Sequence, residues 1–421
     1  MSAIRGSRTS SIGVRDCFDG GPPSTRLMSR AIAPEPVYRP PWDVSLARRL
    51  AMLRAAPRKV AYFHPKPDAS TFRYRCYAMA QAVNRHLAGT AATWFTYDDG
   101  PLPYSLLQDL DLLVLVRTPW TPELAQMIHR AREAATPLLF DVDDLVFDPS
   151  RVVELVASLD AYEADDRRME HIWNHWFAET SRIRLTMEMT DGVIVTNSFL
   201  GNEVQQSTAQ PVWVVPNFMT EEQVAYSNEI LRFLDNNPER PRDEFHLGYF
   251  SGSSTHRRDF GVAVPAICEV LEAHQRVHLR IVGHMEIPKE LRDFKERVHM
   301  HPHTNFLNLQ RLIAFTEVNL APLQDTAFTN CKSELKYFDA AAVGVPTVAS
   351  PTFAMSRAIS HGQNGLLAED NKWHECLRWL VDHYPALGST IGKGAREDAS
   401  KTHVGYAHLD SISIVLEEGC A

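Results

Sequence analysis

Short apolar runs alternate with longer amphipathic segments along most of the chain. In the first half these runs lie at 59–64, 91–97, 111–116, 137–142, 191–196 and 212–216. Between several of them the apolar residues recur with a helical period, which predicts helices at 74–86 and 123–135. Strands that alternate with helices of this length indicate a parallel sheet covered on both faces. The pattern therefore predicts an α/β domain over residues 58–218.

The same rhythm restarts after a polar, proline-containing stretch at 219–244, which we interpret as a linker with a short helix. Apolar runs then follow at 245–250, 278–283, 297–302, 317–322, 346–350 and 365–369. They predict a second Rossmann-like domain over 245–400. In open α/β sheets ligands bind beyond the carboxyl ends of the strands, so we expect both sheets to face an interdomain cleft.

Three segments fall outside this rhythm. Residues 151–189 read as a helical insertion in the first domain, rich in Trp, His and Met. The tail at 401–421 is expected to form a helix that packs back on the first domain. Residues 1–57 form an N-terminal extension with nine Arg against four acidic residues, a net charge of +5, which leaves −14 for the rest of the chain.

Length and composition fit this two-domain interpretation. The 421 residues exceed what one core usually supports, and 44% hydrophobic with 23% charged residues is ordinary for a globular protein. The six cysteines have no CxxC spacing, which argues against a zinc site and a disulfide framework and suits a reducing compartment. No apolar run reaches membrane-spanning length and the N-terminus has no secretory pattern, so we expect a cytoplasmic protein.

Charge excludes one class of partner. The acidic body makes nucleic acid an unsuitable ligand. The basic charge of the N-terminal extension suits a peripheral contact with the anionic inner face of a membrane. The alternative is a disordered tail that has no partner.

A loop of small residues after the strand at 245–250 has the chemistry of an anion site. The segment SGSSTHRR ends in three basic residues and leads into a helix, so backbone N–H groups, a helix start and guanidinium groups converge. The alternative is an ordinary turn with a solvated Arg pair. The candidate donor contacts in this loop are Gly252, Ser253, His256, Arg257 and Arg258.

A second anion site is predicted within CKSELKYFDAAAVGVPTVAS, residues 331–350. We expect a helix from about 334 to 343, capped by Ser333 or Asn330 and ended by Gly344. Lys332, Lys336 and Asp339 would then share one face near a helix N-terminus, where positive charge is unfavourable without an anion. Two such turns in one domain fit one diphosphate.

This stretch resembles the donor-site signature K-x-x-E-A-x-A-x-G-x-P-V-V-A-S of GT-B glycosyltransferases of the GT4 kind. The match covers Lys336, Asp339, Ala342, Gly344 and Pro346. GYFSGSSTHRRDF, HGQNGLLAED and VVPNF resemble further segments of the family, so the resemblance spans about 59–400 and is closest to bacterial enzymes of surface-polysaccharide assembly. It implies two Rossmann-like domains and a carboxylate, here Asp339, that holds the donor ribose.

The chain departs from this family at two positions of the signature. Cys331 stands where the E-x7-E motif would have its first Glu, and Asp339 replaces the second Glu. The family's N-terminal glycine-rich loop is replaced by HPKPDASTFRYR, in which His64, Arg73 and Arg75 are weak candidates for acceptor or phosphate contact.

Acidic residues in FDVDDLVFD, residues 140–148, are candidates for catalysis. Asp141, Asp143 and Asp144 resemble a metal-holding D-x-D, but a diphosphate bound by cations makes a metal redundant, so we expect neither metal nor cofactor. Asp143 and Asp144 are instead interpreted as carboxylates that position or polarise an acceptor hydroxyl. The alternative is a helix cap and a solvated loop.

The predicted function is a glycosyltransferase, retaining by resemblance, that moves a sugar from a nucleotide-diphosphate donor to a glycan or lipid-linked glycan acceptor. Arg258, Lys332 and Lys336 would neutralise the departing diphosphate. The alternatives are a non-hydrogen-transfer nucleotide-sugar epimerase and a catalytically degenerate GT-B module that binds glycan or nucleotide.

Overall fold

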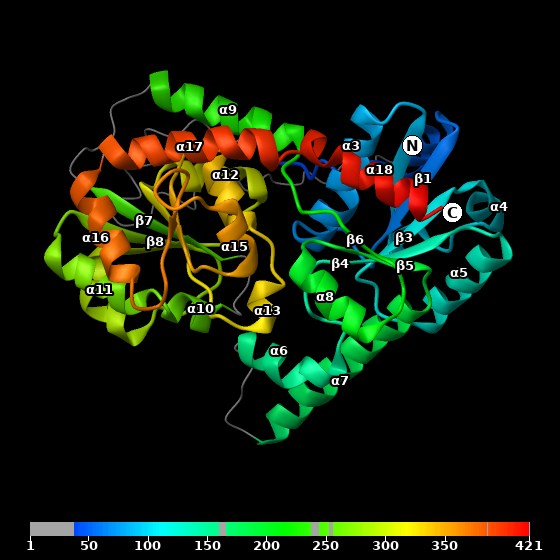
Figure 1. Ribbon diagram of the computed structural model, residues 1–421, viewed down its shortest axis with the longest axis horizontal. Coiled ribbons are helices and arrows are strands. Elements are labelled where there is room, and N and C mark those ends of the chain that lie inside the picture. The colour runs from blue at the N-terminus through cyan, green and yellow to red at the C-terminus, as the bar shows by residue number, and fades with distance from the viewer. Residues whose placement is uncertain (1–37, 160–165, 237–243, 252–255, 385, 421) are drawn as a thin grey trace, which may run out of the picture.

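The computed structural model describes residues 38–159, 166–236, 244–251, 256–384 and 386–420. These residues form two α/β domains that lie side by side (Figure 1). Each domain contains a six-stranded sheet whose strand pairs are all parallel. The prediction of two parallel α/β sheets is therefore confirmed.

The N-terminal sheet has the strand order β2-β1-β3-β4-β5-β6. Its strands are β1 (Arg58–Phe63), β2 (Thr90–Phe95), β3 (Leu112–Val116), β4 (Leu138–Val142), β5 (Gly192–Val195) and β6 (Val212–Val214). The helices around it are α2 (Leu46–Arg54), α3 (Met79–His86), α4 (Tyr104–Asp109), α5 (Pro122–Glu133), α6 (Val152–Ser158), α7 (Asp166–Glu188) and α8 (Ser198–Ser207). Two separate apolar clusters bury its two faces, as near-continuous apolar strands require.

The C-terminal sheet has the strand order β12-β11-β10-β7-β8-β9. Its strands are β7 (Phe245–Phe250), β8 (Val277–Val282), β9 (Val298–His301), β10 (Val318–Ala321), β11 (Thr347–Ala349) and β12 (Leu366–Leu367). Its helices are α10 (Arg257–Gly261), α11 (Val264–Ala273), α12 (Phe306–Ala314), α13 (Ala327–Asn330), α14 (Leu335–Ala341), α15 (Phe353–Ala358), α16 (Trp373–His383) and α17 (Ala386–Thr402).

Strand order locates the two places where a ligand is expected. The order reverses between β1 and β3 in the first sheet and between β7 and β10 in the second. At such a switch point the helices after the two strands leave on opposite faces, which opens a crevice at the carboxyl ends. A side chain near the carboxyl ends of these strands is therefore well placed to contact a ligand.

The chain passes between the domains twice, and the two passages are paired. The first leads from β6 into α9 (Glu221–Asn236), and the second leads from α17 through His403 into α18 (Leu409–Glu418). Met219 and Val404 form an isolated parallel bridge between them. α18 then packs on the N-terminal domain, where Ile412, Val415 and Leu416 join its core (Figure 1).

Three segments differ from the sequence-based expectation. The linker holds a 16-residue helix, α9, which lies along α17 and α12 on the C-terminal domain (Figure 1). The expected extension is shorter than 57 residues, because Trp42 and α2 pack on the N-terminal domain. The expected insertion is the crossover between β4 and β5, because Ile183 and Met187 of α7 belong to the core.

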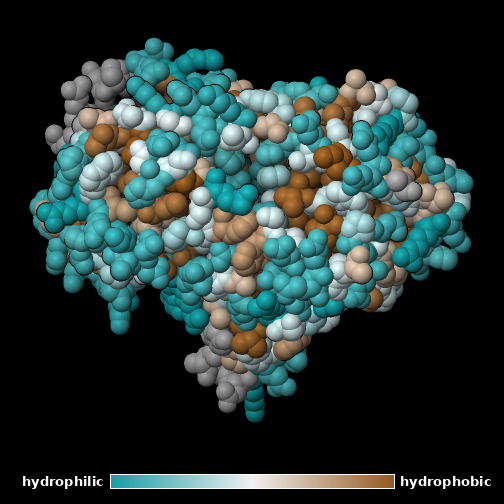
Figure 2. All heavy atoms as spheres, viewed as in Figure 1, coloured by the Kyte–Doolittle hydropathy of each residue, from teal (hydrophilic) through white to brown (hydrophobic). Residues whose placement is uncertain are grey.

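Polar side chains cover most of the molecular face in Figure 2. No helix among the described residues is long and apolar enough to cross a membrane.

Candidate functional site

Lys336 lies at the switch point of the C-terminal sheet. Its Nζ donates a hydrogen bond of 2.8 Å to the carbonyl oxygen of Phe250, the last residue of β7, and lies 4.3 Å from the centre of the Tyr249 ring. Asn319 of β10 holds the start of α14 by donating to the carbonyl of Lys336 at 2.9 Å. Burial lowers the pKa of Lys336 to about 8, with Asp259 opposing the shift and Lys332 adding to it.

Lys332 reaches the N-terminal domain. Its Nζ lies 3.2 Å from Oδ1 of Asp144 and 4.3 Å from the centre of the Phe328 ring. The residue precedes α14, which begins at Leu335, so the expected single helical face holding both lysines is wrong. Both lysines are nevertheless close enough to His256 to lower its pKa, so they belong to one electropositive region.

The expected N-caps of this helix are also wrong. The N-cap position is occupied by Glu334, whose side chain makes no capping bond. Asn330 belongs to the preceding helix α13, and Ser333 accepts a hydrogen bond of 2.9 Å from Asn217. The expected end is confirmed, because Gly344 follows α14 with φ +68°, a conformation that favours glycine.

His256 and Asp259 form the other wall of this region. Nδ1 of His256 lies 3.1 Å from Oδ2 of Asp259, whose Oδ1 accepts two hydrogen bonds from Gln324 at 3.2 Å. Burial lowers the pKa of His256. Burial would raise the pKa of Asp259, but the bonds from His256 and Gln324 outweigh it and the pKa lies below its ordinary value. Asp259 is thus a buried anion that orients His256.

Arg257 and Arg258 are exposed residues in the first turn of α10, directly after His256. Gly252 and Ser253 lie outside the described residues. The start of their loop is fixed by a close backbone approach, because Ser251 donates to the carbonyl of Val282 at 2.8 Å. Gly283 has φ +116°, and a Cβ there would lie 1.9 Å from the Ser251 carbonyl oxygen, so only glycine fits.

Asp339 faces α9 and the N-terminal domain. Its Oδ1 accepts a 2.6 Å hydrogen bond from Gln223 of α9. Burial raises the pKa of Asp339, with Arg73 and Gln223 opposing the shift. Arg73 itself packs its guanidinium 4.4 Å from the centre of the Phe306 ring across the domain boundary, and its side chain bonds to the Tyr74 hydroxyl.

The segment 326–333 docks the C-terminal domain onto the N-terminal one. Phe328 and Cys331 are buried within the core cluster of the N-terminal domain. Asn197 donates to the carbonyl oxygens of Cys331 and Lys332 at 3.0 and 3.2 Å. Cys331, which stands at the family's first Glu, is therefore a packed apolar residue, and burial raises the pKa of its thiol.

A second polar cluster lies at the switch point of the N-terminal sheet. Asp143 follows β4 and accepts hydrogen bonds from Thr71 at 2.7 Å and Arg117 at 3.1 Å. Burial would raise the pKa of Asp143, but Arg117 and Thr71 outweigh it and hold the pKa below its ordinary value. His64 follows β1, and burial lowers its pKa while the nearby Asp68 and Asp143 oppose the shift.

Arg117 joins the two catalytic candidates. It follows β3, and its Nη1 lies 3.1 Å from Asp143 and 3.4 Å from Asp144. Its backbone has φ +41°, which is uncommon for a residue other than glycine. Asp144 thus has two cationic partners, Arg117 in its own domain and Lys332, which connects it to the site at β7.

Arg75 is not available for a ligand. The Arg75 and Asp141 side chains are 0% exposed and form a two-pronged ion pair with both contacts at 2.8 Å. Burial opposes the charge of Arg75, but Asp141 outweighs it, so the pKa of Arg75 is raised. Asp141 is also removed from any D-x-D metal site, because both its oxygens are engaged.

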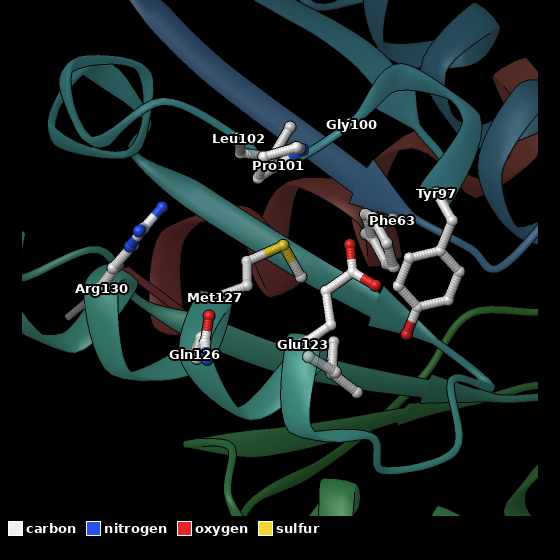
Figure 3. A pocket seen from close by; sticks show the side chains of 10 residues that line it. Phe63, Tyr97, Gly100, Pro101, Leu102, Glu123, Gln126, Met127 and Arg130 are labelled. Atoms are coloured by element: carbon white, nitrogen blue, oxygen red, sulfur yellow. The ribbon is translucent and has the colours of Figure 1, made fainter.

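Two cavities lie elsewhere. One of about 40 Å³ lies between α5 and the turn at Gly100–Leu102, with Phe63 and Tyr97 beside it, and holds only a few water molecules (Figure 3). The other, of about 300 Å³, is lined by residues of α9 and α17, by Ala342 just after α14 and by Met219 of the first passage. Neither is lined by Lys332, Lys336, His256 or Asp143.

Sequence reasoning missed three residues of the site. Arg117 and Gln223 carry no motif, and only the fold brings them to Asp143 and Asp339. Asp259 had a local signal, because an acid three residues after His256 at a helix start faces back towards it.

Comparisons with known proteins agree with this architecture. Residues 245–383 match the model of the family described as glycosyl transferases group 1. Alr3699/HepE from Anabaena in complex with UDP is 13% identical, with a TM-score of 0.56 over 86% of this chain and 100% of that chain. WaaG, a glycosyltransferase involved in lipopolysaccharide biosynthesis, is 16% identical, with a TM-score of 0.53 over 85% of this chain and 99% of that chain.

Sucrose-phosphate synthase from Thermosynechococcus elongatus is likewise 16% identical, with a TM-score of 0.53 over 85% of this chain and 97% of that chain. A search of curated protein sequences found no match. The chain has the GT-B fold of these structures, and its C-terminal domain is similar to the glycosyl transferases group 1 family over residues 245–383. The resemblance to proteins of the GT-B fold, expected over about residues 59–400, is confirmed.

Proposed function

We propose that this protein is a glycosyltransferase that transfers a sugar from a nucleotide-diphosphate donor to an acceptor hydroxyl. One observation carries the proposal. Lys336 reaches the end of β7 beside Lys332 and His256, at the switch point of a glycosyl transferases group 1 domain. Anabaena HepE, which shares the fold, was crystallised with UDP and with UDP-glucose.

The chemistry of transfer follows from the charges at this place. As the bond between the sugar and the diphosphate breaks, negative charge grows on the leaving phosphate. Lys336, Lys332 and Arg258 would neutralise it, in a setting where burial strengthens each interaction. This reaction uses no resident metal or cofactor, because the chain's own cations take that role. The GT4 resemblance supports a retaining outcome.

The acceptor would enter at the switch point of the N-terminal sheet. Asp143 and Asp144 lie there, and Arg117 and Lys332 contact Asp144 from the two domains. We assign Asp144 to the acceptor hydroxyl because the ion pair with Lys332 places it beside the donor site. Contacts between segment 326–333 and the N-terminal domain would exclude water that otherwise hydrolyses the donor. We propose a glycan or lipid-linked glycan as the acceptor, on the resemblance to enzymes of surface-polysaccharide assembly, and a cytoplasmic place of action for the protein.

Binding of UDP tests the donor site directly. UDP at a hundred times its dissociation constant is expected to stabilise the wild type by about 2.7 kcal/mol, seen as a rise in unfolding temperature. Lys336→Ala is expected to lose most of this rise, because a hydrogen bond to a charged group contributes about 1.5–3 kcal/mol. Lys393→Ala, an exposed lysine of α17, is the matched control. An unchanged UDP response in folded Lys336→Ala would refute the site.

Product analysis separates the reaction classes. The protein is incubated with UDP-, GDP- and dTDP-sugars with and without glycan acceptors. Transfer predicts nucleotide release that depends on the acceptor, whereas an epimerase changes the sugar without releasing nucleotide. Nucleotide binding with neither product would leave the degenerate GT-B module.

A further inference from the structure

Three histidines lie side by side on neighbouring strands at the edge of the C-terminal sheet that is opposite the donor site. His246 of β7 and His278 of β8 are paired in the strand register, with ring centres 5.3 Å apart. The His278 ring stacks on that of His299 of β9, and Nδ1 of His278 lies 3.0 Å from Nε2 of His299. Parallel pairing of the strands thus gathers imidazoles that are far apart in the sequence.

Two carboxylates complete this cluster. Oε2 of Glu244, just before β7, lies 3.2 Å from Nε2 of His246. Oε2 of Glu317, just before β10, lies 3.8 Å from Nδ1 of the same ring. His246 therefore has a carboxylate near each ring nitrogen. Glu317 is held there by the backbone N–H of His246, which donates to its Oε2 at 2.6 Å, and a small movement of the ring would let it orient the second nitrogen, as acids do in metal sites.

The ligand atoms of the cluster are slightly farther apart than they would be around a bound metal ion. Glu244, His246 and His278 each offer one ligand atom, and these three atoms lie within 4.8 Å of one another. Bonds of about 2.0–2.2 Å in a tetrahedral zinc site place ligand atoms about 3.3 Å apart. The contact between Glu244 and His246 already has this spacing, and rotation of side chains would bring in the third ligand.

We propose that Glu244, His246 and His278 bind one divalent transition-metal ion. Two imidazoles and one carboxylate favour Zn²⁺ over Mg²⁺ or Ca²⁺, which prefer oxygen ligands. A water molecule completes the tetrahedron. His299 and Glu317 orient the rings of His278 and His246 from outside.

The ion is structural and not part of sugar transfer. His246 lies four residues before Phe250, and at the rise of a strand this separates the metal from the end of β7 by about 13 Å. The ion would tie β8, which pairs with the edge strand β9, to the central strand β7. None of its ligands is a cysteine, so the argument against zinc from the cysteine spacing does not apply.

The test measures zinc on the purified full-length protein after equilibrium dialysis against buffered Zn²⁺. We expect one Zn²⁺ per chain in the wild type and none in His278→Ala and Glu244→Gln. Glu317→Gln is expected to bind Zn²⁺ about 10–100-fold more weakly, as loss of an orienting partner does. His284→Ala is the control, because His284 stacks on His303 in the same domain at a ring distance of 5.7 Å.

Stability provides a second readout. Zn²⁺ should raise the unfolding temperature of the wild type and not that of Glu244→Gln, while both proteins bind UDP equally. Glu244 precedes β7 and its side chain is 37% exposed, so Glu244→Gln is expected to fold. Glu244→Gln therefore tests the metal site even if His278→Ala does not fold. Failure of stoichiometric binding in the wild type, or equal binding in Glu244→Gln and wild type, overturns the proposal. In that case the cluster is a hydrogen-bonded ladder.

Discussion

The ammonium nitrogen of Lys336 lies 2.8 Å from the carbonyl oxygen of Phe250, the last residue of β7. The cation is thus held by this backbone carbonyl and by the face of the Tyr249 ring, and burial lowers the pKa of Lys336 to about 8. A diphosphate would supply the missing negative charge.

This pKa predicts how UDP affinity depends on pH. Below about pH 8 Lys336 is charged with or without UDP, so the affinity is expected to be constant. Above it, binding must be accompanied by proton uptake, and the affinity falls by up to about tenfold per pH unit. Calorimetric titration from about pH 7 to about pH 9 measures this break. In Lys336→Arg it should vanish, because a guanidinium stays charged; a break that remains belongs to another group.

The same shift has a consequence for folding. The folded pKa of about 8 lies below the ordinary value of 10.5, so the charged form of Lys336 disfavours folding at low and neutral pH. This destabilisation is relieved as the pH rises between these two values, because the unfolded state then binds more protons. The free energy of unfolding should therefore rise less with pH over this window in Lys336→Met than in the wild type. Equal slopes in the two proteins would contradict the lowered pKa.

The ion pair between Lys332 and Asp144 predicts opposite effects on binding and turnover. Asp144 competes with a diphosphate for the Lys332 ammonium, so Asp144→Asn should tighten UDP binding by a factor of about 1.4–5, the range of partly exposed ion pairs. Transfer to an acceptor should fall in the same variant, because Asp144 is assigned to the acceptor hydroxyl. Affinity is measured by calorimetry and turnover by nucleotide release.

Glu154→Gln is the matched control for this prediction. Glu154 also joins the domains, by accepting a 3.1 Å hydrogen bond from the backbone of Phe328, but it does not contact Lys332. If both variants tighten UDP binding equally, looser domain contact and not release of Lys332 is the cause.

Local pattern was sufficient for the strands and for part of the donor site. Apolar runs predicted all twelve strands found among the described residues, and Gly344 marked the end of α14. Ion pairs between residues that are far apart in the sequence could not be predicted from local pattern. Lys332 precedes its helix and pairs with Asp144 of the other domain, and the charge of Arg75 is buried against Asp141. From sequence alone, an Arg in a loop is easily interpreted as a ligand contact, because the carboxylate that pairs with it in the fold is not yet known.

Asp339 allows a test of ribose recognition. The family resemblance assigns this carboxylate to the donor ribose, while Gln223 now donates to it at 2.6 Å. The wild type should bind UDP more tightly than 2′-deoxy-UDP, by about tenfold or more if one hydrogen bond to a charged acceptor is lost. Asp339→Ala should bind the two nucleotides equally. Gln223→Met keeps the carboxylate and should keep the preference; a preference retained in Asp339→Ala would rule out the assignment.

The buried pair of Arg75 and Asp141 should matter for stability and not for ligand binding. Arg75→Met leaves the Asp141 carboxylate buried without its partner, which costs about 3–5 kcal/mol of unfolding free energy. Replacing both residues, as Arg75→Met with Asp141→Leu, should recover part of this loss, since no lone charge remains. Urea unfolding measures both variants.

An exposed ion pair provides the comparison for this loss. Arg85 bonds to Glu221, and both side chains are well exposed, so Arg85→Ala should change stability by less than about 1 kcal/mol. The folded fraction of Arg75→Met should bind UDP as the wild type does, because Arg75 is out of reach of any ligand. If Arg75→Met instead keeps its stability but no longer binds UDP, Arg75 contacts the ligand. The ion pair between Arg75 and Asp141 would then have to open when the donor binds.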